Sequence, residues 1–167
     1  MVPPCETTET TATASTLVGM QFVALGPATT EELAALPQVA GAALPPDYLD
    51  WLGTVGGADL SSWVDMPPAI GTGCFNHVYT AIEAIRTQQN RARDDRNYGP
   101  EFLGIASSGN GGSACLLLTG PDAGSIWWCD DTIADAQGPA APGVLTPIAA
   151  TWTEFWQRTL ATEELDG

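Results

Sequence analysis

Apolar residues recur every three to four positions in four segments of the chain, a spacing that is typical of amphipathic helices. The clearest segment is LPPDYLDWLGTVGG at residues 44–57. Its proline pair suits the first turn of a helix, and its closing glycine pair suits a helix C-terminus. Tyr48, Leu52 and Val55 then lie on one face with Trp51 beside them, which predicts a helix that packs on a core.

Capping-box spacings mark the starts of two further helices. Thr29 with Glu32 opens the short helix TEELAAL, which we expect Pro37 to end. Thr151 with Glu154 opens the final helix, TWTEFWQRTLA. The apolar stripe expected on this final helix comprises Trp152, Phe155, Trp156 and Leu160.

A fourth helix is expected over about residues 77–96, with Asn76 as its cap. Its apolar stripe comprises Val78, Ile82 and Ile85. A positive charge is favourable near a helix C-terminus, so we interpret the arginines there as structural, with a docking site for an acidic patch as the alternative. These arginines are four of the five cations in the chain: Arg86, Arg91, Arg93 and Arg96.

Apolar runs separated by glycine-rich turns predict three antiparallel strands, at residues 102–108, 113–119 and 125–131. A five-residue loop in the second hairpin makes Cys115 face Cys129. Both faces of the predicted sheet are apolar. We therefore expect helices to cover one face, while the other is partly covered or is available to a partner. One face carries Cys115, Leu117, Trp127 and Cys129, and the other carries Leu116, Leu118, Ile126 and Trp128.

The rest of the chain is less regular in its pattern. LVGMQFVALG, residues 17–26, suits a first strand, whereas residues 58–76 and 130–147 are rich in breakers and are expected to be irregular. Residues 1–15 are Thr-rich and are expected to form a flexible arm. The sequence therefore predicts one α+β domain over residues 16–167.

Composition and charge limit the classes of partner that the chain can bind. The 167 residues are 44% apolar and include six Trp, enough for a core without metal or disulfide. Twenty acidic residues oppose five arginines and no lysine, for a net charge of -15. Nucleic acids and anionic membranes would repel such a chain, whereas a basic protein would be attracted. The alternative is that acidity serves only to keep the protein in solution.

The N-terminus lacks the basic start and apolar run of a secretory signal, and no apolar stretch approaches the ~20 residues of a membrane span. We therefore expect a soluble cytoplasmic protein whose thiols are reduced.

Three ordered pieces of the chain resemble the SUKH superfamily. LPPDYLDWLGTVGG is similar to its signature helix, FLGIASSGNGGSACLLLTGPDAGSIWWCDD to its glycine-turn strands, and ATWTEFWQRTL to its terminal helix. The likeness spans about residues 30–160; Val55 and Trp156 depart from the usual Asn and Leu, and the segment 58–76 is long for the family. The resemblance implies a central antiparallel sheet with flanking helices. Bacterial members are mostly immunity proteins that inhibit polymorphic or contact-dependent toxins by direct binding, and a yeast cell-wall synthesis regulator belongs to the same superfamily.

Cys74 and His77 form the candidate reactive pair, because a thiol beside an imidazole can act as a nucleophile, but the sequence places no acid to orient them. With Cys115 and Cys129 they could bind zinc, yet the paired spacings of zinc motifs are missing. A disulfide between Cys115 and Cys129 is disfavoured in a reducing cytoplasm. We expect free thiols that act as small apolar residues, with no metal, no cofactor and no catalytic residue.

The densest carboxylates in the predicted domain lie in and after the third of these strands, and no motif for acid–base or magnesium chemistry accompanies them. They suit a solvated acidic loop or the charged rim of an interface. Trp63 and Trp128 are the candidate aromatic anchors, with the core as the alternative place for both. The predicted partner-binding residues are Trp63, Asp65, Asp122, Trp128, Asp130, Asp131 and Asp135.

The sequence thus predicts a non-catalytic immunity protein that binds a cognate toxin with a basic surface, for which a nuclease is a fitting target. The first alternative is a regulatory or scaffolding domain of the same fold. The second is a hydrolase or metal protein that uses Cys74 and His77.

Overall fold

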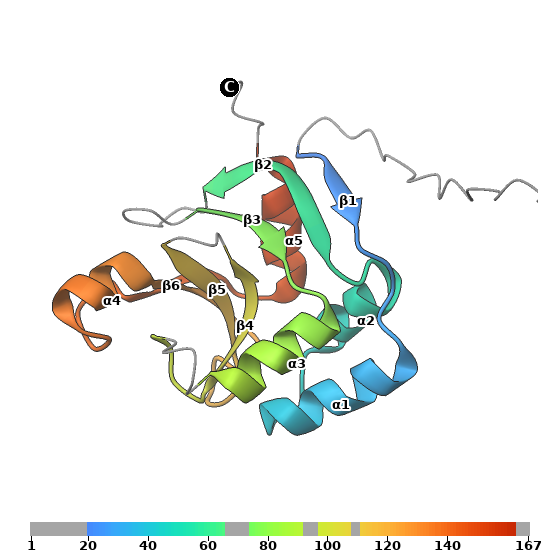
Figure 1. The fold of residues 1–167 in the computed structure, drawn as a ribbon, viewed down its shortest axis with the longest axis horizontal. Coiled ribbons are helices and arrows are strands. Elements are labelled where there is room, and N and C mark those ends of the chain that lie inside the picture. Colours follow the sequence, from blue (N-terminus) through green and yellow to red (C-terminus); the bar gives the residue numbers. More distant parts are fainter. Residues whose placement is uncertain (1–19, 66–73, 92–96, 108–110, 163–167) are drawn as a thin grey trace, which may run out of the picture.

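The computed structural model describes residues 20–65, 74–91, 97–107 and 111–162. Within them, one seven-stranded antiparallel sheet follows the order of the sequence, and five helices pack around it (Figure 1). This architecture confirms the predicted α+β fold with a central antiparallel sheet. The expected arm, residues 1–15, lies outside the described residues.

The strands are β1 (Phe22–Ala24), β2 (Ala58–Asp65), β3 (Cys74–Val78), β4 (Phe102–Ser107), β5 (Gly112–Leu117), β6 (Ile126–Asp130) and β7 (Leu145–Ala149). The helices are α1 (Thr30–Ala40), α2 (Pro46–Thr54), α3 (Ala81–Asn90), α4 (Asp131–Gln137) and α5 (Trp152–Ala161).

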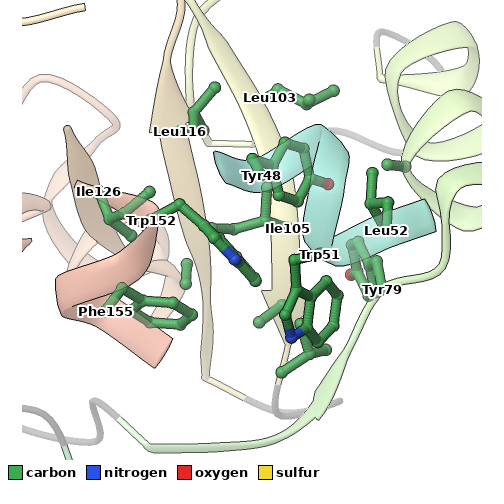
Figure 2. Packing of buried hydrophobic residues seen from close by; sticks show 14 of the residues in the cluster. Tyr48, Trp51, Leu52, Tyr79, Leu103, Ile105, Leu116, Ile126, Trp152 and Phe155 are labelled. Atoms are coloured by element: carbon green, nitrogen blue, oxygen red, sulfur yellow. The ribbon is translucent and has the colours of Figure 1, made fainter. Parts of the chain in front are cut away.

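The main core joins α1, α2, α3 and α5 to one face of the sheet, which we call the inner face. Tyr48 and Trp51 of α2 pack against Trp152 of α5, with ring centroids 4.7 and 4.8 Å apart (Figure 2). Phe155 stacks on Phe75 of β3 at 5.4 Å. The signature helix and the terminal helix therefore meet over the inner face, as their apolar stripes require.

A smaller apolar cluster lies on the opposite, outer face of the sheet. It joins Cys115 and Cys129 to Tyr98, to Ala134 of α4 and to Val144. The strand residues in this cluster belong to β4–β7. Figure 1 shows α4 beside β5 and β6, across the sheet from β1. Helices thus cover both faces of the sheet toward β7, whereas on the outer face of β3 the start of α3 reaches His77 through Glu83, and Val23 of β1 stays 56% exposed.

The first helix does not end at Pro37. It continues to Ala40, because Val39 and Ala40 pack against the core and Gly41 provides the C-cap with a left-handed φ of 70°. A proline inside a helix removes one backbone hydrogen bond at a cost of about 3 kcal/mol, and this local cost is outweighed by burial. The prediction of the Thr29–Glu32 capping box is confirmed, with both reciprocal hydrogen bonds present.

The prediction of an irregular segment at 58–76 is wrong wherever the structure describes it, because β2 and β3 occupy residues 58–65 and 74–78. In β2, Ala58, Leu60 and Val64 are buried and alternate with more exposed residues, which is the period of a half-buried strand. A register shift between Asp59 and Val64 interrupts the pairing with β3. The tested part of the predicted first strand, β1, is confirmed.

The start of the third helix in the chain is also corrected. Thr80, not Asn76, is the N-cap of α3, because Thr80 and Glu83 form a capping box with both reciprocal hydrogen bonds. Residues 77 and 78 therefore belong to β3, and Val78 is buried beneath the sheet rather than on a helical stripe. The helix ends at Asn90 with Arg91 as its C-cap, and Arg93 and Arg96 lie outside the described residues.

The three central strands are confirmed, but their register is shifted by two residues. Cys115 lies opposite Trp127, and Cys129 lies opposite Ser113. The hairpin loop is longer than expected because the Leu118 amide leaves the hairpin and donates to the Glu101 carbonyl at 2.7 Å. A shift of two preserves which residues share a face, so the predicted faces are correct.

The stretch expected to be irregular at 130–147 contains α4 and the first part of β7. Pro147 has no amide hydrogen, which a strand tolerates at the edge of a sheet, and β7 is an edge strand. The final helix is confirmed: Thr151 accepts a hydrogen bond from the Glu154 amide at 3.1 Å and α5 follows.

Candidate functional site

One row of directly paired residues crosses the sheet on its outer face. Val23 at one end of this row is 56% exposed, whereas Ser113 and Cys129 are 3% and 0% exposed. The outer face therefore changes from open at β1–β3 to covered at β5 and β6. From β1 to β7 the row comprises Val23, Asp59, His77, Ser107, Ser113, Cys129 and Leu145.

Trp63 lies on the open part of this face. Val64, the next residue in β2, is buried in the main core on the inner face, so Trp63 points to the opposite, outer side. Trp63 is 41% exposed, which is unusual for so large an apolar side chain. We call this region the open face; it comprises the exposed Val23, Asp59 and Trp63 and the partly buried His77 and Glu83.

His77 is held by two carboxylates on the open face. Its Nδ1 lies 2.6 Å from Asp59 Oδ1, and its Nε2 lies 3.1 Å from each carboxylate oxygen of Glu83. Burial of the ring lowers the pKa of His77, but the hydrogen bonds and negative charges of Asp59 and Glu83 outweigh burial and raise this pKa above its ordinary value. The positive imidazolium form is therefore favoured.

Sequence reasoning missed Asp59 and Glu83 as partners of His77. Asp59 faces His77 only because β2 pairs with β3, and residues 58–65 were expected to be irregular. Two signals were available in the sequence: the alternation of apolar and polar residues from Ala58 to Ser61, and the capping-box spacing from Thr80 to Glu83.

The carboxylates predicted to form one patch are separated by the length of β6. Asp130 and Asp131 lie at the start of α4, where Asp131 Oδ1 accepts a hydrogen bond from Asn97 Nδ2 at 2.8 Å. Asp135 lies in α4 and is exposed, with Oδ1 3.5 Å from the same Asn97 nitrogen. Asp122 lies in the loop before β6, at the other end of that strand.

Two of the predicted contact residues are buried. Trp128 is 1% exposed and belongs to the main core, so its side chain has no surface to offer a partner. Asp130 is also 1% exposed, and its Oδ1 accepts a hydrogen bond from the Ile133 amide at 3.0 Å as the N-cap of α4. Neither residue is kept as a contact residue.

Trp63 and Asp65 lie toward the end of the sheet that also carries the start of α4. His77 pairs with Ser107 at the end of β4, so Trp63 and Asp65 in β2 lie beyond that pair, toward the end of the sheet where β4 ends and β5 begins. Gly112 in turn pairs with Asp130 at the start of α4. The structure thus places Trp63, Asp65, Asp131 and Asp135 toward one end of the sheet and Asp122 at the other.

Asp122 borders a hollow of about 620 Å³, which shares Ala123 and Ala150 in its wall with a second hollow of about 370 Å³. Two other carboxylates line them. Asp47 accepts hydrogen bonds from the Thr153 amide and hydroxyl at 3.0 and 2.8 Å, which ties α2 to α5. Glu154 accepts one from the Ala150 amide at 2.8 Å. These two carboxylates therefore hold the starts of helices in place.

The cysteines are placed unfavourably for chemistry. Burial and the charges of Asp131 and Asp130 raise the pKa of Cys129 to about 12, so its thiol is protonated at neutral pH and weakly nucleophilic. Both ring nitrogens of His77 already face carboxylates, which leaves neither to accept a proton from Cys74. Cys74, Cys115 and Cys129 are not in disulfides.

The described residues offer neither a metal site nor a membrane-spanning helix. No group of three or more His, Cys, Asp or Glu side chains is arranged to hold a metal ion in the described part of the chain. Among the helices described, none is long and apolar enough to cross a membrane.

The fold, with its signature helix α2 and terminal helix α5, agrees with a comparison to known families. Residues 27–158, well over half of the chain, match the model of the SMI1 / KNR4 family (SUKH-1). No curated protein matches the sequence. The matched span runs from the residues before α1 into α5 and so includes the paired core helices, the whole described part of β2–β7 and the open face of β2 and β3. The chain therefore belongs to the SMI1 / KNR4 family (SUKH-1).

Proposed function

We propose that this chain is a non-catalytic immunity protein that binds and neutralises a cognate bacterial toxin in the cytoplasm. Membership of the SUKH-1 family supports a role in protein–protein interaction. The observation that carries the proposal is the open face, where Trp63 is 41% exposed and Val23 is 56% exposed on the side of the sheet opposite the main core.

Charge supports a basic partner. The chain has a net charge of -15 and no lysine, and such a field speeds encounter with a cationic protein. Large aromatic side chains, Trp above all, are common energetic centres of interfaces. A toxin with a basic, nucleic-acid-cleaving cleft fits this combination, because a surface that attracts phosphates also attracts carboxylates.

We expect Trp63 to anchor the partner, with Asp65, Asp131 and Asp135 at the same end of the sheet steering its approach. Asp131 and Asp135 sit at or near the start of α4, where their shared partner Asn97 limits their movement. Asp122, at the opposite end of β6, is left outside this contact region.

The experiment is protection in cells. The neighbouring reading frame is expressed in a bacterium with and without this chain, and growth is measured. We expect the neighbour to arrest growth alone, and co-expression of the chain to restore growth through a complex that copurifies. A harmless neighbour that does not bind the chain would contradict the immunity role and favour a regulatory domain of the same fold.

A further inference from the structure

The Asp59–His77–Glu83 cluster has an unusual requirement for protons. Ionised carboxylates only accept hydrogen bonds, and both ring nitrogens of His77 lie within 3.1 Å of carboxylate oxygens. Both nitrogens must therefore donate, which requires the imidazolium form. Neutral imidazole would leave one nitrogen lone pair facing a carboxylate, which is repulsive.

The cluster is held in place by β2, β3 and the start of α3. Asp59 lies directly opposite His77 in the β2–β3 pairing. Glu83 is held by the start of α3, where its Oε2 accepts hydrogen bonds from the amide and the hydroxyl of Thr80 at 2.8 and 3.0 Å. Tyr79, with its ring centroid 5.7 Å from that of His77, is the further titratable group against the ring.

The carboxylates of the cluster nevertheless reach the surface. The side chain of His77 is 28% exposed, while those of Asp59 and Glu83 are 59% and 39% exposed. Val23 lies directly across from Asp59, and Trp63 lies further along the same strand on the same side. A charged centre beside exposed apolar side chains suits a partner that presents a cation next to an apolar surface.

We propose that the open face docks a cationic side chain of the partner against Asp59 and Glu83, and that docking expels the proton of His77 to the solvent. The proposal rests on the proposed function and adds the chemistry of its contact. A partner Lys or Arg and the imidazolium of His77 compete for the same two carboxylates, because two positive charges at this spacing repel each other.

This competition makes the affinity of the open face for its cationic partner depend on pH. Protonated His77 leaves the cluster with one net negative charge, whereas neutral His77 leaves two, so the deprotonated face binds a cation more tightly. If docking lowers the pKa of His77 by about one unit, affinity rises by about tenfold as the pH passes upward through the two values.

The test uses the fact that His77 is the only histidine of the chain. The Cε1 proton of His77 is followed by NMR against pH, free and in complex with the unlabelled protein encoded by the neighbouring reading frame, after any purification tag is removed. Calorimetry of the same binding, in two buffers of different ionisation enthalpy, counts the protons released. We expect a lower His77 pKa in the complex and net proton release near neutral pH.

Variants of this chain show whether the protons released on binding come from His77 or from groups of the partner. His77→Gln keeps a hydrogen-bonding side chain without charge, and should abolish the proton release while the protein still binds. Asp59→Asn should weaken binding several-fold, whereas the matched change Asp122→Asn at the opposite end of β6 should not. Melting of each variant by circular dichroism verifies folding.

Three outcomes are distinguishable. An unchanged or raised His77 pKa in the complex, or equal proton release by wild type and His77→Gln, overturns this inference and leaves the immunity role standing. Binding that tolerates Asp59→Asn overturns it as well. Failure of the two proteins to bind at any pH overturns the proposed function and this inference together.

Discussion

Two tryptophans show how far environment decides the role of a residue. Trp128 and Trp63 were equal candidates for an interface, yet Trp128 is 1% exposed in the main core and Trp63 is 41% exposed on the open face. Both lie in strands of the same sheet. Trp128 points to the inner face, which the core helices cover, whereas Trp63 points to the outer face at β2, and a local pattern does not reveal which face the helices cover.

We predict that Trp128→Ala lowers the free energy of unfolding by about 3–5 kcal/mol, because it removes a large buried side chain and leaves a cavity. Trp63→Ala should cost less than about 1 kcal/mol, as a surface change. Urea denaturation followed by circular dichroism measures both. Similar losses for the two variants would contradict the assignment of Trp63 to the surface.

The raised pKa of His77 makes stability depend on pH. The folded protein binds the His77 proton more tightly than the unfolded chain, so the stabilisation is complete below the ordinary histidine pKa and is lost as pH rises through the folded value. We predict that the stability advantage of wild type over His77→Gln shrinks as the pH is raised from below the ordinary histidine pKa into the mildly alkaline range. A constant advantage across that range, measured by urea denaturation, would show that the two carboxylates do not hold the imidazolium.

At the scale of elements, helix caps decide where helices begin. Thr29, Thr80 and Thr151 each accept a hydrogen bond from the amide of a glutamate three residues later. The caps at Thr29 and Thr151 were predicted from the sequence. The third was overlooked in favour of Asn76, and α4 was overlooked because its cap, Asp130, had been interpreted as part of an acidic surface.

We predict that Asp130→Ala lowers the free energy of unfolding by about 1 kcal/mol, because the Ile133 amide loses its acceptor. Asp130→Asn keeps an acceptor oxygen and should cost less. Thermal melting of the two variants measures the difference. If Asp130→Ala leaves stability intact, the buried carboxylate is not a working cap.

Elements with strong local signals were predictable, and those defined by pairing were not. The helix at 46–54 has prolines at its start and glycines after its end, and Gly56 adopts a φ of 82° in which a Cβ would clash with the Gly26 carbonyl. By contrast, β2 carries a register shift and β7 contains a proline, so their patterns resemble loops. Their strand character depends on neighbours that are distant in sequence.

The same reasoning explains the register error in the β5–β6 hairpin. Alternation along each strand fixes the face of every side chain, and this part was correct for Cys115 and Cys129. Register depends on loop length, which here depends on a hydrogen bond from Leu118 to Glu101 in the segment before β4. Such a contact between strands carries no local sequence signal.

At the scale of the whole molecule, the asymmetric cover of the sheet is the central feature. Helices cover the inner face, and α4 with its neighbouring loops covers the outer face of β4–β7. The candidate contact residues could be predicted only in part, because Trp63 was identified while Asp59 and Glu83 required the fold. Charge, a property of composition alone, was readable from the sequence.

Local charge should set the rate of association. We predict that Asp135→Lys slows association with the proposed partner several-fold at low salt and weakens the dependence of the rate on salt, because Asp135 is exposed at the end of the sheet proposed for contact. Asp122→Lys makes the same change of net charge at the other end. Stopped-flow rates for the two variants should differ; equal rates would mean that total charge alone steers the encounter.

The central claim is that the open face is where a partner binds, and the affinity of Trp63→Ala tests it most directly. Calorimetry would compare wild type, Trp63→Ala and the control Asp122→Asn in binding to the protein encoded beside this chain. We predict that Trp63→Ala, still folded, weakens binding by at least about 2 kcal/mol while Asp122→Asn binds as wild type does. Wild-type affinity of a folded Trp63→Ala variant would contradict the claim.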